Sequence, residues 1–285
     1  HVAALLAEHE ISTPALVAAW DGLGYGPDGQ WWGSEVYRCD QEIVPAFGLM
    51  PFPLPGGDKC AHEPWRVMSA LALQSGISPE RVRAWLLQLP VSGDSAREST
   101  ASESTARDTR LMLFDSLLSG FKFSQSTSMG RFLEACACRI FNLADNFFEG
   151  HLASKLEYSA FAAQTAKGAF QWEMPLVKDE CGVLRWQWQA VIRSLWQASP
   201  IDFTPHHYAK WLLEGVVSSL LKVCKETEYL TLGVSGGCFQ NTYWLEWLQE
   251  NCPTHGIKLL RPLRLPPNDG AIAYGQVQDL LMRSK

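Results

Sequence analysis

The sequence predicts an α/β protein that carries a large, mainly helical insertion, and three observations indicate this class. Near the start, the strand-like segments 15–20 and 31–38 flank a Gly-rich turn, a pattern typical of a hairpin. From residue 230 onwards, strand and helix patterns alternate, which indicates an α/β layer with a mostly parallel sheet. Helical periodicity dominates between these two parts, so we expect the middle of the chain to be inserted into the layer.

The first 58 residues are predicted to form a short helix, a hairpin and a loop. The apolar pattern of residues 1–9 indicates a helix, and the hairpin strands 15–20 and 31–38 follow it. Residues 51–58 contain prolines at alternate positions. Because proline lacks an N–H donor and fixes φ, this segment is expected to be an extended loop rather than a helix or a central strand.

The middle of the chain shows helical periodicity with recognisable start signals. Ser78 before Pro79, and Ser128, are suitable N-caps. Helices are expected at about 62–75, at about 79–90 and at 129–143. Residues 92–110 contain only Ser, Gly, Asp, Ala, Arg, Glu and Thr. Such a composition buries too little apolar area to offset the entropy of ordering, so we expect a mobile loop there.

The last hundred residues return to strands and helices. The alternating pattern of 184–189 predicts a strand that places Trp186 and Trp188 on one face. The elements expected after it are a helix at 206–226, a strand at 230–234, a helix at 242–251, a strand at 257–261 and a helix from about 270.

Composition excludes several classes of function. The 285 residues carry a formal net charge of −6 without a strong cluster of Lys and Arg, so nucleic acid is not an expected partner. No apolar run approaches the roughly 18–20 residues of a membrane span, so we expect no membrane association. The eight cysteines form no C-x-x-C pair, which is typical of free thiols in a reducing, cytoplasmic compartment.

Three Gly-rich turns follow or precede apolar segments, and together they suggest a nucleotide site with a metal. They are Asp21-Gly-Leu-Gly-Tyr-Gly26, the turn at 235–237 and Pro266-Pro-Asn-Asp-Gly270. Backbone N–H groups at such turns can approach an anion, and a nearby carboxylate can hold the accompanying cation. Taken singly, each has an ordinary alternative: Asp21 and Asp269 as turn formers, and the 235–237 segment as a tight turn between strand and helix.

Other candidate residues also have structural alternatives at this stage. Asn241 could cap a helix instead of binding a ribose or base, His1 could be a frayed terminus, and Glu134 could be a solvated charge. The residue patterns alone leave these alternatives open.

The order of the motifs resembles one known family. The motifs are His1-Val-Ala-Ala-Leu-Leu-Ala-Glu-His9, Asp21-Gly-Leu-Gly-Tyr-Gly26, Trp32-Gly-Ser-Glu35, Pro53-Leu-Pro-Gly-Gly-Asp58, Glu63-Pro-Trp-Arg66, Ser128-Met-Gly-Arg131, Phe148-Glu-Gly150, Ser235-Gly-Gly-Cys-Phe-Gln-Asn241 and Pro267-Asn-Asp-Gly270. This series is similar to the C-terminal domain of HypF, the carbamoyltransferase of nickel–iron hydrogenase maturation. The resemblance runs nearly end to end, with residues 92–110 as the exception.

The resemblance implies an actin/sugar-kinase/Hsp70-type (ASKHA) fold, of which this chain would be the second lobe without the first. In that scheme, residues 1–13 are the remnant of a helix from the first lobe, and 14–58 begin the second α/β lobe. Residues 59–165 are the helical insertion, and 166–285 complete the lobe. The first lobe and the upstream HypF domains would then be partners of this segment.

The resemblance also implies the site and its chemistry. It makes His1, Asp21 and Asp269 metal ligands, for Fe, Zn, Mn or Mg, with Asp21 and Asp269 also catalytic. The positions that it assigns to ATP or carbamoyl-adenylate are Gly22, Gly24, Gly150, Glu134, Ser235, Gly236, Gly237 and Asn241. The implied reaction transfers a carbamoyl group from carbamoyl-adenylate to the C-terminal cysteine of an acceptor protein, HypE.

Several positions depart from the family pattern, and they keep two other functions open. Leu23 replaces a threonine, Glu134 an aspartate and His151 a glutamine, while Lys155 reverses a charge. These changes favour a non-catalytic, nucleotide-binding scaffold as the first alternative. The second alternative is an O-carbamoyltransferase that acts on a small-molecule alcohol.

Overall fold

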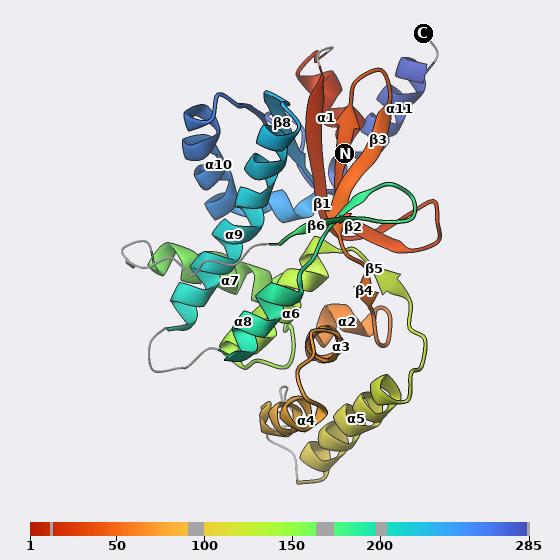
Figure 1. Ribbon diagram of the computed structural model, residues 1–285, viewed down its shortest axis with the longest axis vertical. Coiled ribbons are helices and arrows are strands. Elements are labelled where there is room, and N and C mark those ends of the chain that lie inside the picture. The colour runs from red at the N-terminus through yellow and green to blue at the C-terminus, as the bar shows by residue number, and fades with distance from the viewer. Residues whose placement is uncertain (12–13, 91–99, 164–173, 198–203, 284–285) are drawn as a thin grey trace.

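One mixed sheet forms the centre of the upper half of the molecule (Figure 1). The structure, a computed structural model, describes residues 1–11, 14–90, 100–163, 174–197 and 204–283. Within these residues the strands are β1 (Ala15–Tyr25), β2 (Trp31–Cys39), β3 (Ile43–Leu49), β4 (Phe52–Pro53), β5 (Gln125–Ser126), β6 (Leu176–Lys178), β7 (Leu184–Trp186), β8 (Thr231–Ser235) and β9 (Lys258–Leu260).

The strand order is β6-β7-β3-β2-β1-β8-β9, and short β5 joins β2 to β4. The hairpin β1–β2 is antiparallel, as are the pairs β2–β3 and β6–β7, whereas β8 lies parallel to both β1 and β9. The predicted hairpin at the start and the parallel pairing expected after residue 230 are both confirmed, but the sheet as a whole is mixed and not mostly parallel. Strands β1, β2 and β3 follow one another with short turns, and a short turn can only connect antiparallel neighbours.

The helices are α1 (Val2–Glu8), α2 (Lys59–His62), α3 (Trp65–Gln74), α4 (Pro79–Gln88), α5 (Thr100–Leu118), α6 (Met129–Phe141), α7 (His151–Ala162), α8 (Gln189–Gln197), α9 (Pro205–Glu226), α10 (Thr242–Thr254) and α11 (Ile272–Arg283). Helices α2 to α5 lie below the sheet in Figure 1. The predicted N-caps are confirmed: the Ser78 and Ser128 side chains accept hydrogen bonds from the backbone N–H groups of Arg81 and Arg131.

Strand β1 separates two apolar cores because alternate side chains of a strand point to opposite faces. Leu16 and Trp20 belong to the main core, which α6, α9 and α10 cover. Val17 points the other way and packs with Leu5 of α1 and with Leu260. The sheet is thus covered on both faces. The parallel strands β1 and β8 end on the same side of the sheet, next to the helices.

Part of the expected loop at 92–110 is helical. Residues 92–99 lie outside the described residues, but α5 begins at Thr100 and continues to Leu118. Arg110 is buried and donates hydrogen bonds to the carbonyl oxygens of Leu86, Leu89 and Pro90 at 3.2, 2.7 and 2.8 Å. The polar composition concealed a residue that joins α5 to the end of α4.

The strands β3, β5 and β6 and the helices α7 and α8 were also not predicted. The predicted strand at 184–189 ends at Trp186, and α8 begins at Gln189. Trp186 and Trp188 are both buried, and the indole N–H of Trp188 donates to the carbonyl of Met50 at 2.7 Å. This bond satisfies a buried donor at the point where the chain leaves the sheet.

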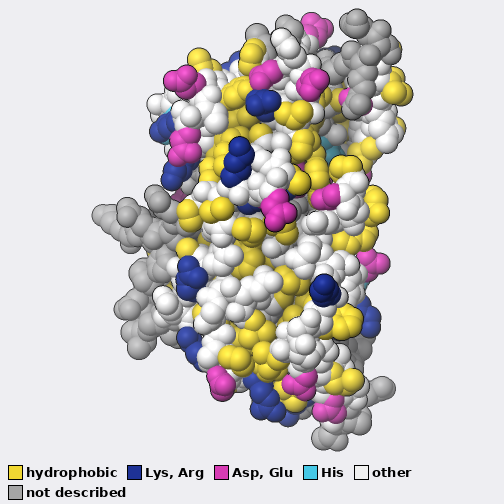
Figure 2. Space-filling model, turned by 45° about the vertical axis from the view of Figure 1, so that its right-hand side comes forward, with side chains coloured by type: hydrophobic (Ala, Val, Ile, Leu, Met, Phe, Trp, Pro, Cys, Tyr) yellow, Lys and Arg dark blue, Asp and Glu magenta, His cyan; other side chains and the backbone are white. Residues whose placement is uncertain are grey.

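In the part of the chain that the structure describes, no helix combines the length and the apolarity that crossing a membrane requires. Figure 2 shows one face of the molecule, on which Lys and Arg side chains are scattered among acidic and apolar ones. The Lys and Arg side chains of the described residues therefore form no continuous stripe on that face.

Candidate metal centre

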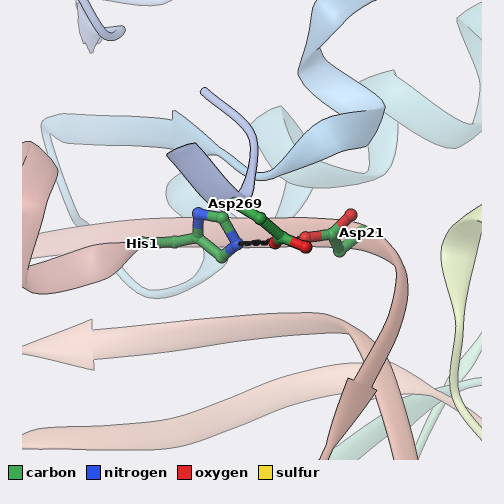
Figure 3. Close-up of side chains that lie close together, drawn as sticks. All are labelled: His1, Asp21 and Asp269. Atoms are coloured by element: carbon green, nitrogen blue, oxygen red, sulfur yellow. Dashed lines mark hydrogen bonds and ion pairs between the residues drawn. The ribbon is translucent and has the colours of Figure 1, made fainter. Parts of the chain in front are cut away.

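Three side chains from distant parts of the sequence meet at one edge of the sheet (Figure 3). The Nε2 atom of His1 lies 3.0 Å from Oδ2 of Asp21 and 3.5 Å from Oδ1 of Asp269. One ligand atom from each residue lies within 4.8 Å of the other two. The structure thus brings together the three residues expected to hold a metal.

Asp21 lies within β1, where the strand is irregular; the strand expected at 15–20 continues to Tyr25, so most of the Gly-rich segment predicted to be a turn is strand. The pairing of β1 with β2 shifts register between Trp20 and Gly24, and such bulges re-aim side chains next to functional sites. Oδ1 of Asp21 accepts a hydrogen bond from the backbone N–H of Gly22 at 2.7 Å. Burial raises the pKa of Asp21, but the hydrogen bonds from His1, Gly22 and Gly237 outweigh it and keep the pKa below its usual value. Asp21 is therefore ionised at neutral pH.

Asp269 lies on the short 3₁₀ helix η3 (Asp269–Ala271), just before α11. The loop that leads to η3 is tied to the end of β8, because the N–H of Gly236 donates to the Pro267 carbonyl at 2.7 Å. The side chain of Asn268 accepts from the N–H of Gly270 at 3.1 Å and fixes the turn. The Asp269 side chain itself is 79% exposed, so it can approach a ligand from solvent.

Helix α1 positions two parts of the site. It begins directly after His1, whose side chain is 14% exposed. At its other end, the carboxylate of Glu8 accepts hydrogen bonds from the backbone N–H groups of Leu263, Arg264 and Leu265 at 3.1, 2.6 and 3.2 Å. The same short helix therefore holds His1 against Asp21 and anchors the loop that carries Asp269.

The donor set fits a divalent cation. One imidazole and two carboxylates suit Fe, Mn, Zn or Mg, and two carboxylates at this distance repel each other unless a cation or water lies between them. The hydrogen bond to Asp21 is the main cause that raises the pKa of His1, against the opposing effect of burial. The Nδ1 atom of His1 is buried without a hydrogen-bond partner. Figure 3 shows that Nδ1 faces away from both carboxylates, so a cation between the three side chains would bind the Nε2 atom of His1.

The turn after β8 lies directly beside Asp21. Gly236 has φ of +100°, and a β-carbon there would overlap the carbonyl group of Trp20. A β-carbon on Gly237 would lie 2.7 Å from Oδ1 of Asp21. Glycine is therefore required at both positions by backbone conformation or by close approach. Ser235, the last residue of β8, is buried at the start of this turn.

The other positions that the resemblance assigned to nucleotide are placed less closely. Gly22 adjoins Asp21, but the structure records no contact of Asp21 with Gly24, Gly150 or Asn241, all of which it describes. Gly150 is the N-cap of α7, with φ of +75° and open space on its side-chain face. The side chain of Asn241 accepts a hydrogen bond from the N–H of Trp244 at 3.0 Å and so caps α10. This is the structural alternative that the sequence left open for Asn241.

Glu134 is not the solvated charge that the residue pattern alone suggested. It lies on α6 with a side chain that is 2% exposed, and its Oε2 lies 2.9 Å from Nη1 of Arg131. Burial raises the pKa of Glu134 to about 7, although Arg131 and Asn146 partly oppose that effect. The amphipathic pattern of α6 places Glu134 on the buried face of the helix. This pattern was the available sequence signal for burial, and the prediction of a solvated charge did not use it.

The sequence analysis predicted Ser128 only as a helix N-cap and missed that the start of α6 touches β1 at Asp21 and Gly22. The hydroxyl of Ser128 donates to the carbonyl oxygen of Gly22, and it lies 3.4 Å from that of Asp21. A β-carbon on Gly130 would lie 2.8 Å from the Cα of Gly22. The motif Ser128-Met-Gly-Arg131 was the available signal, since small residues mark a close approach of two backbones.

Comparisons with known proteins agree with this architecture. The family model described as "Carbamoyltransferase, Kae1-like Domain, second subdomain" matches residues 17–276. A carbamoyltransferase HypF2 of Cupriavidus necator is 28% identical over 310 residues, which cover all of this chain and 36% of that protein. A carbamoyltransferase HypF homolog of the same organism is 28% identical over 285 residues and covers 97% of this chain and 67% of that protein.

The fold is similar to that of solved structures. A crystal structure of full-length HypF in the phosphate- and nucleotide-bound form superposes with a TM-score of 0.77 at 23% identity, over 99% of this chain and 42% of that one. Sequence identity at this level supports the shared fold alone. The mixed α/β architecture is therefore that of a Kae1-like domain of the ASKHA type, and the chain spans about a third of the length of most curated relatives that it matches.

Proposed function

The chain belongs to the family of second subdomains of the Kae1-like carbamoyltransferase domain, and we propose that it carries the metal- and nucleotide-binding residues of a carbamoyltransferase. The convergence of His1, Asp21 and Asp269 beside the glycine turn at 236–237 is the observation that carries this proposal. We propose carbamoyl-adenylate as the carbamoyl donor and the C-terminal cysteine of a HypE-like protein as the acceptor.

The proposed reaction is an acyl transfer. The acceptor thiolate attacks the carbamoyl carbon, a carbon–sulfur bond forms, and the bond between that carbon and the phosphate oxygen breaks. AMP leaves with the bonding electron pair, and the thiol proton goes to solvent. A divalent cation supplies charge neutralisation at a phosphate or carbonyl oxygen in such a reaction.

The residues of this chain have distinct parts in the proposal. His1, Asp21 and Asp269 would hold the cation, and the depressed pKa of Asp21 keeps its carboxylate available at neutral pH. The glycines at 236 and 237 let the turn after β8 approach the backbone of Trp20 and the carboxylate of Asp21, because a β-carbon at either position would clash there. The Gly236–Pro267 hydrogen bond holds the β8 turn and the Asp269 loop in one arrangement.

Metal binding tests the first part of the proposal. Titration of Mn²⁺ into the metal-free chain, followed by calorimetry, should show one site, and Asp21→Asn should lower its affinity by roughly 10-fold or more. Asp108→Asn, which changes an exposed carboxylate of α5, is the matched control and should bind Mn²⁺ like the original chain. Equal affinity in the Asp21 variant would contradict the site.

Transfer is tested with synthetic carbamoyl-adenylate and a HypE-like acceptor that ends in cysteine. Mass spectrometry should detect a carbamoylated acceptor, and replacing its terminal cysteine by serine should abolish the product. Binding of ATP and Mn²⁺ without transfer to this acceptor would refute the acceptor assignment. Carbamoylation of hydroxylated small molecules in place of the protein would instead favour an O-carbamoyltransferase.

A further inference from the structure

Arg131 lies beside the candidate metal centre, and neither the resemblance nor the comparisons assign it a role. Its backbone N–H is bonded to the N-cap Ser128, so the residue belongs to the first turn of α6. A β-carbon built on Gly22 would lie 3.5 Å from Nη2 of Arg131, which places the guanidinium beside Gly22 in the irregular part of β1.

The guanidinium is enclosed, yet its hydrogen-bonding capacity is largely unused. The side chain of Arg131 is 10% exposed, and Nε and Nη1 are buried without hydrogen-bond partners in the described structure. A guanidinium carries five N–H donors in a planar fork that matches the oxygens of a carboxylate or phosphate. Leaving such donors unpaired in a protein interior is costly, so their persistence points to a group that binds there.

Glu134 fixes the position of this cation without filling its donors. Oε2 of Glu134 lies 2.9 Å from Nη1 of Arg131, but the pair lacks the geometry of a hydrogen bond, and both atoms remain without one. A buried ion pair of this kind stabilises a protein only when its remaining donors and acceptors are satisfied. The arrangement is therefore a poor structural ion pair and a suitable holder for an anion-binding guanidinium.

We propose that Arg131 is an anion-binding residue of this site and that its guanidinium receives phosphate oxygens of the nucleotide beside Asp21 and Gly22. This inference rests on the proposed nucleotide function. The cation held by His1, Asp21 and Asp269 and the Arg131 guanidinium would then contact the phosphate groups from two sides. Arg131 touches none of the three candidate metal ligands through its side chain in the described contacts, so its effect on metal binding is small.

The proposal is tested with ATP and with inorganic phosphate as probes. In the presence of Mn²⁺, Arg131→Ala should weaken ATP binding by roughly 10–100-fold, the loss expected for charge-assisted hydrogen bonds. Arg131→Lys should recover part of the affinity, because it restores the charge but not the planar fork. The affinity for Mn²⁺ alone should stay within about threefold of that of the original chain. If Arg131 had only a structural role, its removal would lower the affinity for Mn²⁺ as well as that for ATP.

Two further variants keep the result interpretable. Removing Arg131 alone leaves Glu134 buried and unpaired, so the double variant Arg131→Met with Glu134→Gln removes both charges and keeps similar shapes. Arg139→Ala is the matched control, because Arg139 lies on the same helix and packs over Trp196. The control should bind ATP like the original chain, and the double variant should not.

The outcomes separate this inference from the proposed function. If the original chain binds ATP and the Arg131 variants bind it equally well, the role of Arg131 is refuted while the nucleotide site stands. If the original chain does not bind ATP, the proposed nucleotide function is refuted. Inorganic phosphate then tests Arg131 independently. Phosphate binding that is lost in the Arg131 variants supports the anion site, whereas no phosphate binding, or binding that does not depend on Arg131, refutes it.

Discussion

The first turn of α6 and the end of β1 touch through backbone atoms, since a β-carbon on Gly130 would lie only 2.8 Å from the Cα of Gly22. The hydroxyl of Ser128 reinforces this contact by donating to the Gly22 carbonyl. Gly33 of β2 closes the same junction, because a β-carbon there would lie 2.7 Å from the carbonyl oxygen of Asp21. The geometry of β1 at Asp21 and Gly22 therefore depends on glycines in two other elements.

Gly130→Ala should destabilise the protein, because the new methyl group must push α6 away from β1. We expect a loss of about 1–3 kcal/mol in the free energy of unfolding, the range for an overpacked site. Gly22→Ala is the control, since its β-carbon would meet only Arg131, at an ordinary 3.5 Å. Urea denaturation of both variants measures the difference, and equal stabilities would show that the junction can relax.

The parts of the fold that sequence predicted well are those set by local chemistry. Ser78 and Ser128 cap helices because a hydroxyl next to free backbone N–H groups has the same effect in most contexts. The strand predicted at 15–20 likewise forms, and its alternate side chains enter the two cores. The pairing of β3 with β7 could not be predicted, because it joins segments more than a hundred residues apart.

The candidate site shows the same division. The convergence of Asp21 and Asp269 was expected from turns at one sheet edge and from the resemblance, and the structure places both beside His1. The burial of Glu134 and the position of Arg131 beside Gly22 depend on how α6 packs against β1. Such packing is tertiary information that no spacing of residues along the chain contains.

Arg110→Ala should destabilise the junction between α4 and α5. The buried guanidinium donates to three carbonyl oxygens at the end of α4, and truncation would leave those acceptors without it. We expect a loss of roughly 2–4 kcal/mol, from several charge-assisted hydrogen bonds. Arg107→Ala, an exposed change on the same helix, is the control for urea denaturation. A loss no greater than that of the control would show that α5 is not held by Arg110.

Asp269→Asn should weaken metal binding without affecting stability. The Asp269 side chain is 79% exposed, so the fold gains little from it, whereas removal of its charge takes an anionic ligand from the cation. Calorimetric titration with Mn²⁺ should show a loss of roughly 10-fold or more, with a melting temperature within about 2 °C of the original. An unchanged Mn²⁺ affinity would remove Asp269 from the ligand set.

Glu134→Gln should stabilise the protein in alkaline solution but not in acid. The pKa of Glu134 is about 7 in the folded state and 4.5 as the reference value of the unfolded chain. Between these pH values the folded state binds more protons than the unfolded state, so the original chain loses stability as pH rises through this window.

A glutamine cannot ionise, so the variant avoids that loss. The two proteins should have similar unfolding free energies at pH 5, and the variant should gain about 1–3 kcal/mol over the original at pH 8. The control is Glu246→Gln on α10, whose exposed carboxylate should give the same small difference at both pH values. If the unfolding free energies of Glu134→Gln and of the original chain change by the same amount between pH 5 and pH 8, then Glu134 is ionised throughout this range. Its partnership with Arg131 would in that case be a fully charged ion pair.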